Sequence, residues 1–332
     1  MSAASEPVFQ PPPLPSSSDP EPPPRPKKLR PFAIGLFVLG LLLVIGQIAG
    51  FVPGGASAGA AFAFCGLALF GLSFIRLPQL EAKQAPMSTV QTLMAIFYEP
   101  TAVFRNLRVH PRWIVALLVV AVLSTAYSVA FVRRVTPERI VNFTTDKLAE
   151  SGFMTAEVIE QQRQIRLEQA KNPTYQAMSH LSGFAVTFLK YCVFTGLVFV
   201  GILAFGGRMN FWQAFAAVIY AVLPWTVIQK VLSLILLYIK SPDDIHPILN
   251  QDTLVQDNLG AFISPADHPV LFVLASVVGL LWIYWIWLLA KGLQHTGTKV
   301  SGSAAWGVTI TLTVLMVGAG AVMALLFGSF MS

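Results

Sequence analysis

Long uncharged apolar runs alternate with shorter polar segments along almost the whole chain. A bilayer core of about 30 Å is crossed by about 20 helical residues, and seven runs reach roughly that length. We therefore predict an all-α integral membrane protein with about seven transmembrane helices, arranged as a two-helix hairpin followed by a five-helix bundle. The runs are 32–51, 56–75, 113–131, 183–205, 211–239, 270–290 and 304–330.

The fifth run, 211–239, is too long for one straight crossing and carries Pro224 near its middle. Proline removes a backbone donor and disturbs the helix before it, although side chains, water or neighbouring helices can satisfy the freed carbonyl. We expect this segment to be kinked or split, which would make the number of crossings six or eight.

Composition agrees with a membrane protein, because 55% of the residues are hydrophobic and only 11% are charged. Such a chain cannot cover itself with a water-facing surface, so lipid must cover part of it. The positions of Lys and Arg predict the orientation. With the N-terminus inside, cytoplasmic segments carry twelve Lys and Arg against five acids, and external segments carry eight against eleven. Arg133 and Arg134 are the exception, because they adjoin a span on the external side.

The chain divides into three parts by composition. Residues 1–31 include eleven prolines and predict a disordered cytoplasmic tail; a P-x-x-P ligand at Pro12–Pro15 is the alternative to a simple tether. Residues 32–76 form the hairpin, in which Gly46, Gly50, Gly55 and Gly59 pack the two helices together or dimerise them with another copy. Residues 77–332 form the remaining membrane domain.

The cytoplasmic segment before the third run predicts two short interfacial helices. Ser88 and Gln91 form a capping-box pattern, and Pro100 ends the first helix. The second places Arg105 and Arg108 toward water, and Arg112 follows just before the third run. We interpret Arg105, Arg108 and Arg112 as candidate contacts for lipid headgroups; a basic flank that only sets orientation is the alternative.

Several short motifs resemble the membrane domain of the Yip (Ypt-interacting protein) family in its prokaryotic form. The entry segment carries Phe97-Tyr98-Glu99-Pro100, Phe104, Leu107 and Pro111-Arg112-Trp113. The later segments carry Gly207, Phe211, Gln213 and Ala221-Val222-Leu223-Pro224, then the run Trp285–Leu293, in which the acidic residue often found upstream is absent.

The resemblance covers about 88–330 and implies a Yip-like five-helix membrane domain that starts in the cytoplasm and ends outside. Eukaryotic relatives are associated with small GTPases and vesicle trafficking, but no activity carries over to particular residues. The prokaryotic character implies the plasma (inner) membrane of a bacterium, with a cytoplasmic N-terminus and an extracytoplasmic C-terminus.

The external loop 132–180 predicts two helices. One starts at Thr136-Pro137-Glu138 and ends near Gly152, and the other runs from Thr155 to Lys171 before Asn172-Pro173. The second helix is polar on nearly every side, so it either binds a protein partner or covers the domain as a solvated lid.

Lys190 and Lys230 lie inside predicted spans, about ten residues from the external ends of their helices. Charge inside a bilayer is costly and marks functional sites. Together with the kink at Pro224, these lysines form a candidate intramembrane polar site for an anionic headgroup or substrate. In the alternative interpretation, each lysine extends along its helix and places its ammonium at the membrane surface.

The sequence contains no recognisable catalytic, cofactor-binding or metal-binding motif. Cys65 and Cys192 both lie in spans and are interpreted as packing residues, and the Asp and His residues of loop 240–268 match no metal-binding spacing. We therefore expect a non-enzymatic protein that organises membrane proteins or lipids. The alternative is a permease or channel for a small anionic solute, using Lys190 and Lys230. Expected partners are membrane lipids, other membrane proteins or a second copy of the chain, and no nucleic acid.

Overall fold

The computed structural model describes residue 26 and residues 29–77, 85–150, 152 and 154–327. Most of the tail predicted at 1–31 lies outside these residues. The described part of the chain is helical, with no strand beyond two isolated bridges. Its α-helices are α1 (Leu29–Ile48), α2 (Gly55–Leu72), α3 (Thr89–Ala95), α4 (Pro100–Val109), α5 (Ile114–Val135), α6 (Pro137–Glu150), α7 (Ala156–Lys171), α8 (Pro173–Ala204), α9 (Phe211–Ile239), α10 (Pro269–Ser276), α11 (Leu280–Thr296) and α12 (Gly302–Phe327).

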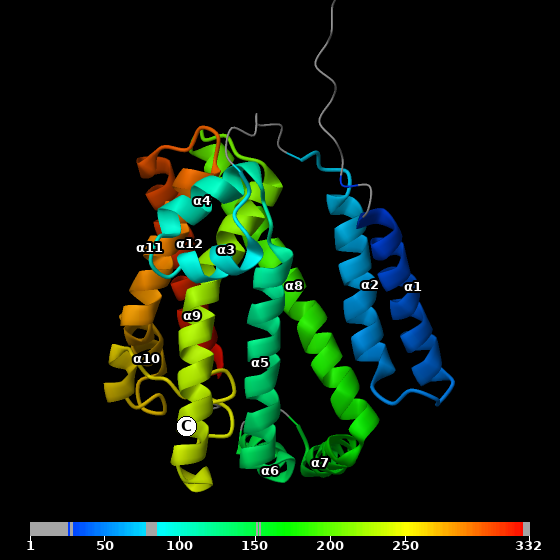
Figure 1. The fold of residues 1–332 in the computed structure, drawn as a ribbon. Coiled ribbons are helices and arrows are strands. Elements are labelled where there is room, and N and C mark those ends of the chain that lie inside the picture. The colour runs from blue at the N-terminus through cyan, green and yellow to red at the C-terminus, as the bar shows by residue number, and fades with distance from the viewer. Residues whose placement is uncertain (1–25, 27–28, 78–84, 151, 153, 328–332) are drawn as a thin grey trace, which may run out of the picture.

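The long helices lie side by side and alternate in direction between two ends of the molecule (Figure 1). We name these the α4 end, where α3 and α4 lie, and the α7 end, where α6 and α7 lie. Within the described residues, six helices are long and apolar enough to cross a membrane: α1, α2, α5, α8, α9 and α12. The prediction of an all-helical protein with several membrane-crossing helices is confirmed.

The run predicted as a single span at 270–290 is not one helix. The chain returns from the α7 end in two pieces, α10 and α11, separated at Val277–Gly279. The loop before α10 reaches into this break: Leu259 N donates to Val278 O at 3.1 Å, and the Asp257 carboxylate accepts from Leu281 N at 2.7 Å. Asp257 thereby caps the start of α11. Apolar composition alone gave no sign of this insertion.

Helix α9 is continuous through Pro224, so of the two expected forms, kinked or split, the split into two helices is excluded. Asn210 and Gln213 form a reciprocal capping box at its start: Asn210 Oδ1 accepts from Trp212 N at 2.9 Å, and Gln213 Oε1 accepts from Asn210 N at 2.8 Å. Its first half, including Pro224, is buried among other helices. At 29 residues, α9 is about 44 Å long and exceeds the thickness of a bilayer core.

Helices α1 and α2 pack against each other through glycine backbones. A Cβ added at Gly59 would lie 2.4 Å from Gly40 O, and one added at Gly55 would lie 2.5 Å from Leu43 O. Gly50, in contrast, has no atom within 4 Å of such a Cβ. The glycines of α2 therefore pack inside the helix pair, but their main partner on α1 is Gly40 and not the Gly46-x-x-x-Gly50 motif.

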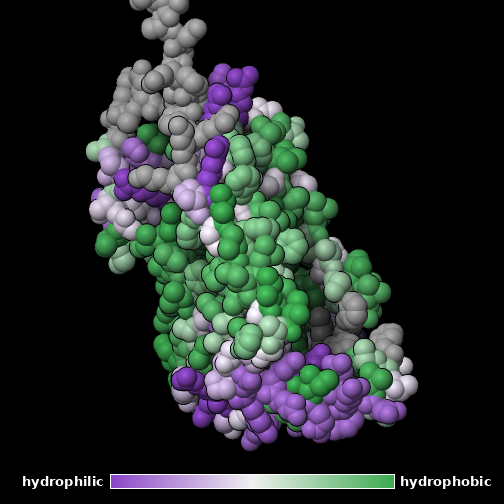
Figure 2. Space-filling view, turned by 90° about the vertical axis from the view of Figure 1, so that its right-hand side faces the viewer, coloured by the Kyte–Doolittle hydropathy of each residue, from purple (hydrophilic) through white to green (hydrophobic). Residues whose placement is uncertain are grey.

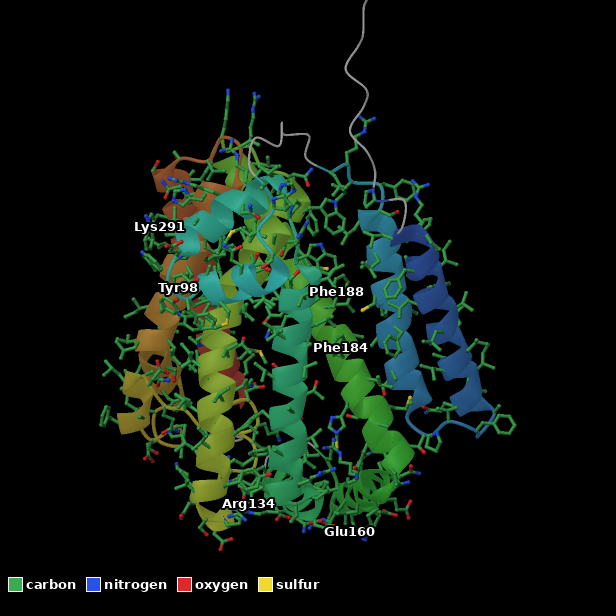
Figure 3. All side chains as sticks on the ribbon, viewed as in Figure 1. Tyr98, Arg134, Glu160, Phe184, Phe188 and Lys291 are labelled. Atoms are coloured by element: carbon green, nitrogen blue, oxygen red, sulfur yellow. The ribbon has the colours of Figure 1, made fainter. Side chains whose placement is uncertain are left out.

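An apolar cavity of about 570 Å³ lies among α1, α2, α5 and α8 near the α4 end, beside the direct contact of α2 with α8. Phe184 and Phe188 of α8 line it, together with Phe62 and Leu69 of α2 and Trp113 before α5 (Figure 3). The outer surface has the same character: Figure 2 shows hydrophobic residues over the middle of the molecule and hydrophilic residues gathered at the α7 end. This distribution suits a molecule surrounded by lipid.

Helices α6 and α7 form the polar layer of the α7 end, as the caps in the sequence predict. Arg163 of α7 binds Asp146 of α6 at 2.6 Å and Glu160 of its own helix at 3.3 Å. Asn172 ends α7 and also caps α8, its Oδ1 accepting from Thr174 N at 2.9 Å. The two helices pack on each other and cover the ends of α5 and α8 (Figure 1).

Candidate functional site

The helix pair α3–α4 is fixed onto the bundle by buried side chains and one buried amide. Ser88 Oγ accepts from Gln91 N at 3.2 Å to start α3, and Pro100 starts α4. Phe104 is fully buried and lies against Gly292 of α11, where an added Cβ would come within 3.0 Å of its ring. Gln213 Nε2 of α9 donates to Arg108 O at 2.7 Å. These contacts hold α4 on the bundle, and α3 packs against α4.

The outer face of this layer is apolar where α3 lies. Val90 is 71% exposed, Met94 60% and Tyr98 68%. Tyr98 and Lys291 both lie at this end of the molecule, and Arg134 and Glu160 lie at the other (Figure 3). Apolar side chains beside cations are typical of a helix at the boundary of headgroups and acyl chains. We name Val90, Met94 and Tyr98 the α3 face.

The three arginines predicted to contact headgroups are placed differently. Arg108 Nη2 donates to Thr298 O at 3.1 Å, and Arg112 Nη1 donates to Met87 O at 3.4 Å, so both also tie segments of the protein together. Arg105 is exposed on α4. Each retains N–H groups beyond those bonds, because a guanidinium carries five.

A polar cavity of about 650 Å³ lies among α5, α8, α9 and the loop that follows α9, and both intramembrane lysines line it. Pro224 does not line it, although its neighbours Trp225 and Thr226 do. The structure therefore brings Lys190 and Lys230 to one cavity and leaves Pro224 as a packing residue of α9. Other polar residues of the wall are Ser124, Ser128, Thr187, Gln229, Gln251, Asp252 and Thr253.

Lys230 is buried, with 9% of its surface exposed. Its Nζ donates to the backbone carbonyl of Asp252 and lies 4.9 Å from the centroid of the Tyr127 ring. These contacts direct the ammonium to the cavity wall, so extension to the membrane surface does not describe Lys230. A carbonyl dipole and a π face stabilise the ammonium without neutralising it.

Lys190 is exposed on α8, and its Nζ lies 6.0 Å from the centroid of the Tyr191 ring. Within the described residues, no carboxylate oxygen lies within 4.0 Å of either lysine. The cavity therefore contains two cations without a directly paired anion.

The loop 245–254 forms one wall of this cavity and is fastened to two helices. Tyr127 of α5 donates its hydroxyl to Asn250 O at 2.6 Å, and Leu254 N donates to Ser233 Oγ of α9 at 3.1 Å. His246 holds the loop internally, because its Nδ1 accepts from Ile248 N and Leu249 N at 3.1 and 3.0 Å. An imidazole that accepts at Nδ1 is neutral.

We predict that this loop loosens in acid because of His246. Burial, followed by the charges of Arg139 and Lys147, lowers its pKa from the ordinary 6.5. The stability that the neutral ring contributes is therefore complete above pH 6.5 and is lost as the pH falls through the lower folded-state pKa. When the pH is lowered from 7.5 to 5.5, the midpoint of thermal unfolding in detergent should decrease less for His246→Asn than for wild type. A matched change at the exposed His268 should leave the wild-type pH dependence, and an unaltered profile in His246→Asn would contradict this role.

Comparison with known families decides what kind of membrane domain this is. A family model described as the Yip1 domain matches residues 94–322. The chain belongs to the Yip1 domain family. Neither the curated proteins nor the solved structures contain a match. The matched part of the chain includes α4 to α11 and most of α12, whereas α1 and α2 precede it.

The residues that carry the family resemblance meet at the α4 end of the Yip1 domain. Trp113 stacks on Trp212 with 6.0 Å between ring centroids and meets Phe215 edge-on at 5.0 Å. Phe211 stacks on Phe215 at 6.0 Å, next to the capping box of α9. The Yip1 motifs therefore build the junction on which α3 and α4 rest.

Polar residues on one face of α5 give a further sequence signal of the polar cavity. Ser124 and Ser128 are four residues apart, so they share one face of α5 with Tyr127 nearby, and all three face the cavity or its loop. Polar residues at helical spacing inside a span indicate such a face. Asp252 supplies the carbonyl that binds Lys230, and no local pattern identifies it as a partner.

Proposed function

We propose that this Yip1 domain protein is non-enzymatic and organises membrane proteins or lipids at its α4 end. The observation that carries the proposal is the α3 face: three exposed side chains, Val90, Met94 and Tyr98, on a helix pair held to the bundle through α4, at the same end of the molecule as Arg105 and Arg108 of α4. Exposed apolar side chains at an end of the molecule that also carries cations suit binding at the membrane surface.

In this proposal the α4 end lies in the cytoplasm, and the described end of α12 lies on the extracytoplasmic side. The basis is the excess of Lys and Arg in the segments of the α4 end, which membrane insertion retains on the cytoplasmic side. Arg105, Arg108 and Arg112 then contact the headgroups of anionic lipids. Partners are membrane lipids and other membrane proteins, or a second copy of this chain.

Affinity capture of the full-length chain from membranes tests the proposal, with copurifying proteins and lipids identified. We expect Val90→Ser with Met94→Ser to lose most of the proteins or anionic lipids captured by wild type. Val193→Ser with Leu197→Ser is the matched control, because these residues are also exposed, apolar and four apart, but lie on α8.

Two results would contradict the organising role. One is an identical set of captured molecules for wild type and the α3-face variant. The other is uptake of a small anion by proteoliposomes that is abolished by Lys190→Ala, which would support a permease instead.

A further inference from the structure

We propose that the polar cavity lined by Lys190 and Lys230 binds the phosphate group of a phosphate ester. This site is separate from the α3 face, since it lies among α5, α8 and α9 and the loop after α9. The proposal goes beyond the organising role and does not depend on it. It rests on the charge of the cavity, on its hydrogen-bond donors and on its size.

The walls of the cavity carry a net positive charge. Lys190 and Lys230 contribute two cations, and among the residues that the structure describes Asp252 is the one acidic residue that lines the cavity. The Asp252 side chain is exposed, and within the described residues it lies beyond 4.0 Å from both ammonium groups. Asp252 gives Lys230 a direct hydrogen bond only through its uncharged backbone carbonyl, whereas its carboxylate acts on the ammonium from a longer distance. An anion placed between the lysines would therefore complete the site, because a buried ammonium is costly without a counter-charge.

Neutral donors surround the two cations. Ser124, Ser128, Thr226 and Gln229 line the same cavity as the two lysines, and each of these side chains carries a hydrogen-bond donor. Thr226 is 3% exposed and Gln229 is 9% exposed, so their polar atoms are largely withdrawn from the outer surface. A phosphate accepts several hydrogen bonds at once and matches this set of donors better than a carboxylate with two oxygens.

The size and the accessibility of the cavity favour an esterified phosphate. Its volume of about 650 Å³ lies within the range of about 300–1,000 Å³ typical of small-ligand sites, and it exceeds what a bare phosphate needs. Trp225 and Tyr191 supply apolar surface for the attached group. Lys190 is exposed, so the site can be reached from outside the helix bundle. Both a lipid headgroup and a soluble glycerol phosphate offer this chemistry.

Two binding measurements on the purified full-length protein distinguish these sources. In the first, soluble glycerol phosphate is titrated into protein in nonionic detergent. In the second, protein from nanodiscs of phosphatidylglycerol or of phosphatidylcholine is analysed by native mass spectrometry for retained lipid. Saturable binding of glycerol phosphate or of phosphatidylglycerol supports the proposal if the binding depends on the cavity. Which of the two binds shows whether the ligand is a soluble phosphate ester or a lipid headgroup.

Lys190→Gln tests that dependence, because Lys190 forms no ion pair within the described chain and its loss should leave the fold intact. We expect binding to weaken at least about tenfold, as for loss of a charge-assisted hydrogen bond. Lys240→Gln, at the end of α9 and outside the cavity, should bind as wild type does.

Three results would overturn the proposal. They are the absence of saturable binding of either probe, equal binding by wild type and Lys190→Gln, and binding that is kept in Lys190→Gln but lost in Arg105→Gln. The last pattern would place the bound phosphate at the α4 end. Because the proposal concerns the cavity alone, each of these results leaves the test of the α3 face unaffected.

Discussion

A leucine at position 59 is expected to push α1 and α2 apart and to destabilise the protein by about 1–3 kcal/mol or more. The Cβ of any side chain there would lie 2.4 Å from Gly40 O and 2.9 Å from Val44 N. Both obstacles are backbone atoms, so no rotamer change relieves the clash. In lipid this loss is serious, because helices associate there through close packing and not through the hydrophobic effect.

Gly71→Leu is the matched control for Gly59→Leu. Gly71 lies on the same helix, and a Cβ at this position has no atom within 4 Å. The midpoint of thermal unfolding in detergent should fall for Gly59→Leu and stay close to wild type for Gly71→Leu. Equal midpoints for the two variants would show that the packing of α1 on α2 does not depend on the close backbone contact between Gly59 and Gly40.

Truncation of Phe104 to alanine is expected to release α4 from the Yip1 domain at a cost of about 3–5 kcal/mol. Phe104 of α4 is fully buried against α11. Its ring occupies the space that the missing side chain of Gly292 leaves free. The substitution would leave a cavity where a rigid glycine backbone cannot fill it. Since α3 packs on α4, the α3 face should also lose its position on the bundle.

Phe97→Ala removes the same side chain from the same layer, but Phe97 is 39% exposed. The thermal midpoint of Phe97→Ala should therefore differ from wild type much less than that of Phe104→Ala. We also expect the amides of α4 to exchange faster with solvent deuterium in Phe104→Ala. Unchanged exchange there would mean that other contacts suffice to hold α4.

Features that depend on neighbouring residues in the sequence were predictable. The runs of apolar residues located six long helices, Ser88 located the start of α3 and Asn172-Pro173 located the end of α7. The start of α8 at Pro173 was not predicted, because the apolar run begins about ten residues later. The motifs that resembled the Yip family lie largely within the matched region 94–322. Each of these signals acts within a few residues of the structure it produces.

Features that depend on distant contacts were not predictable in this way. The break between α10 and α11 arises because Asp257 caps Leu281 across 24 residues of chain. Pro224 leaves α9 intact because the surrounding helices bury its first half. Gly40 became the partner of Gly59 through the register of two helices, which no local motif specifies.

The candidate polar site was predictable as a pair of unusual charges but not as a cavity. Lysine within an apolar run is conspicuous in the sequence, and both lysines line the same cavity. The other wall residues come from α5 and from a loop after α9, so their approach depends on tertiary structure. The carbonyl of Asp252 beside Lys230 belongs to that loop and could not be assigned beforehand.

The central claim is that the α3 face binds other molecules at the membrane surface. The most direct measurement is photo-crosslinking in intact membranes, with a photoreactive amino acid at Met94 or, for comparison, at the similarly exposed Val193 of α8. We predict discrete protein or anionic-lipid adducts at Met94 and only bulk-lipid adducts at Val193. Bulk-lipid adducts alone at both positions would contradict the claim.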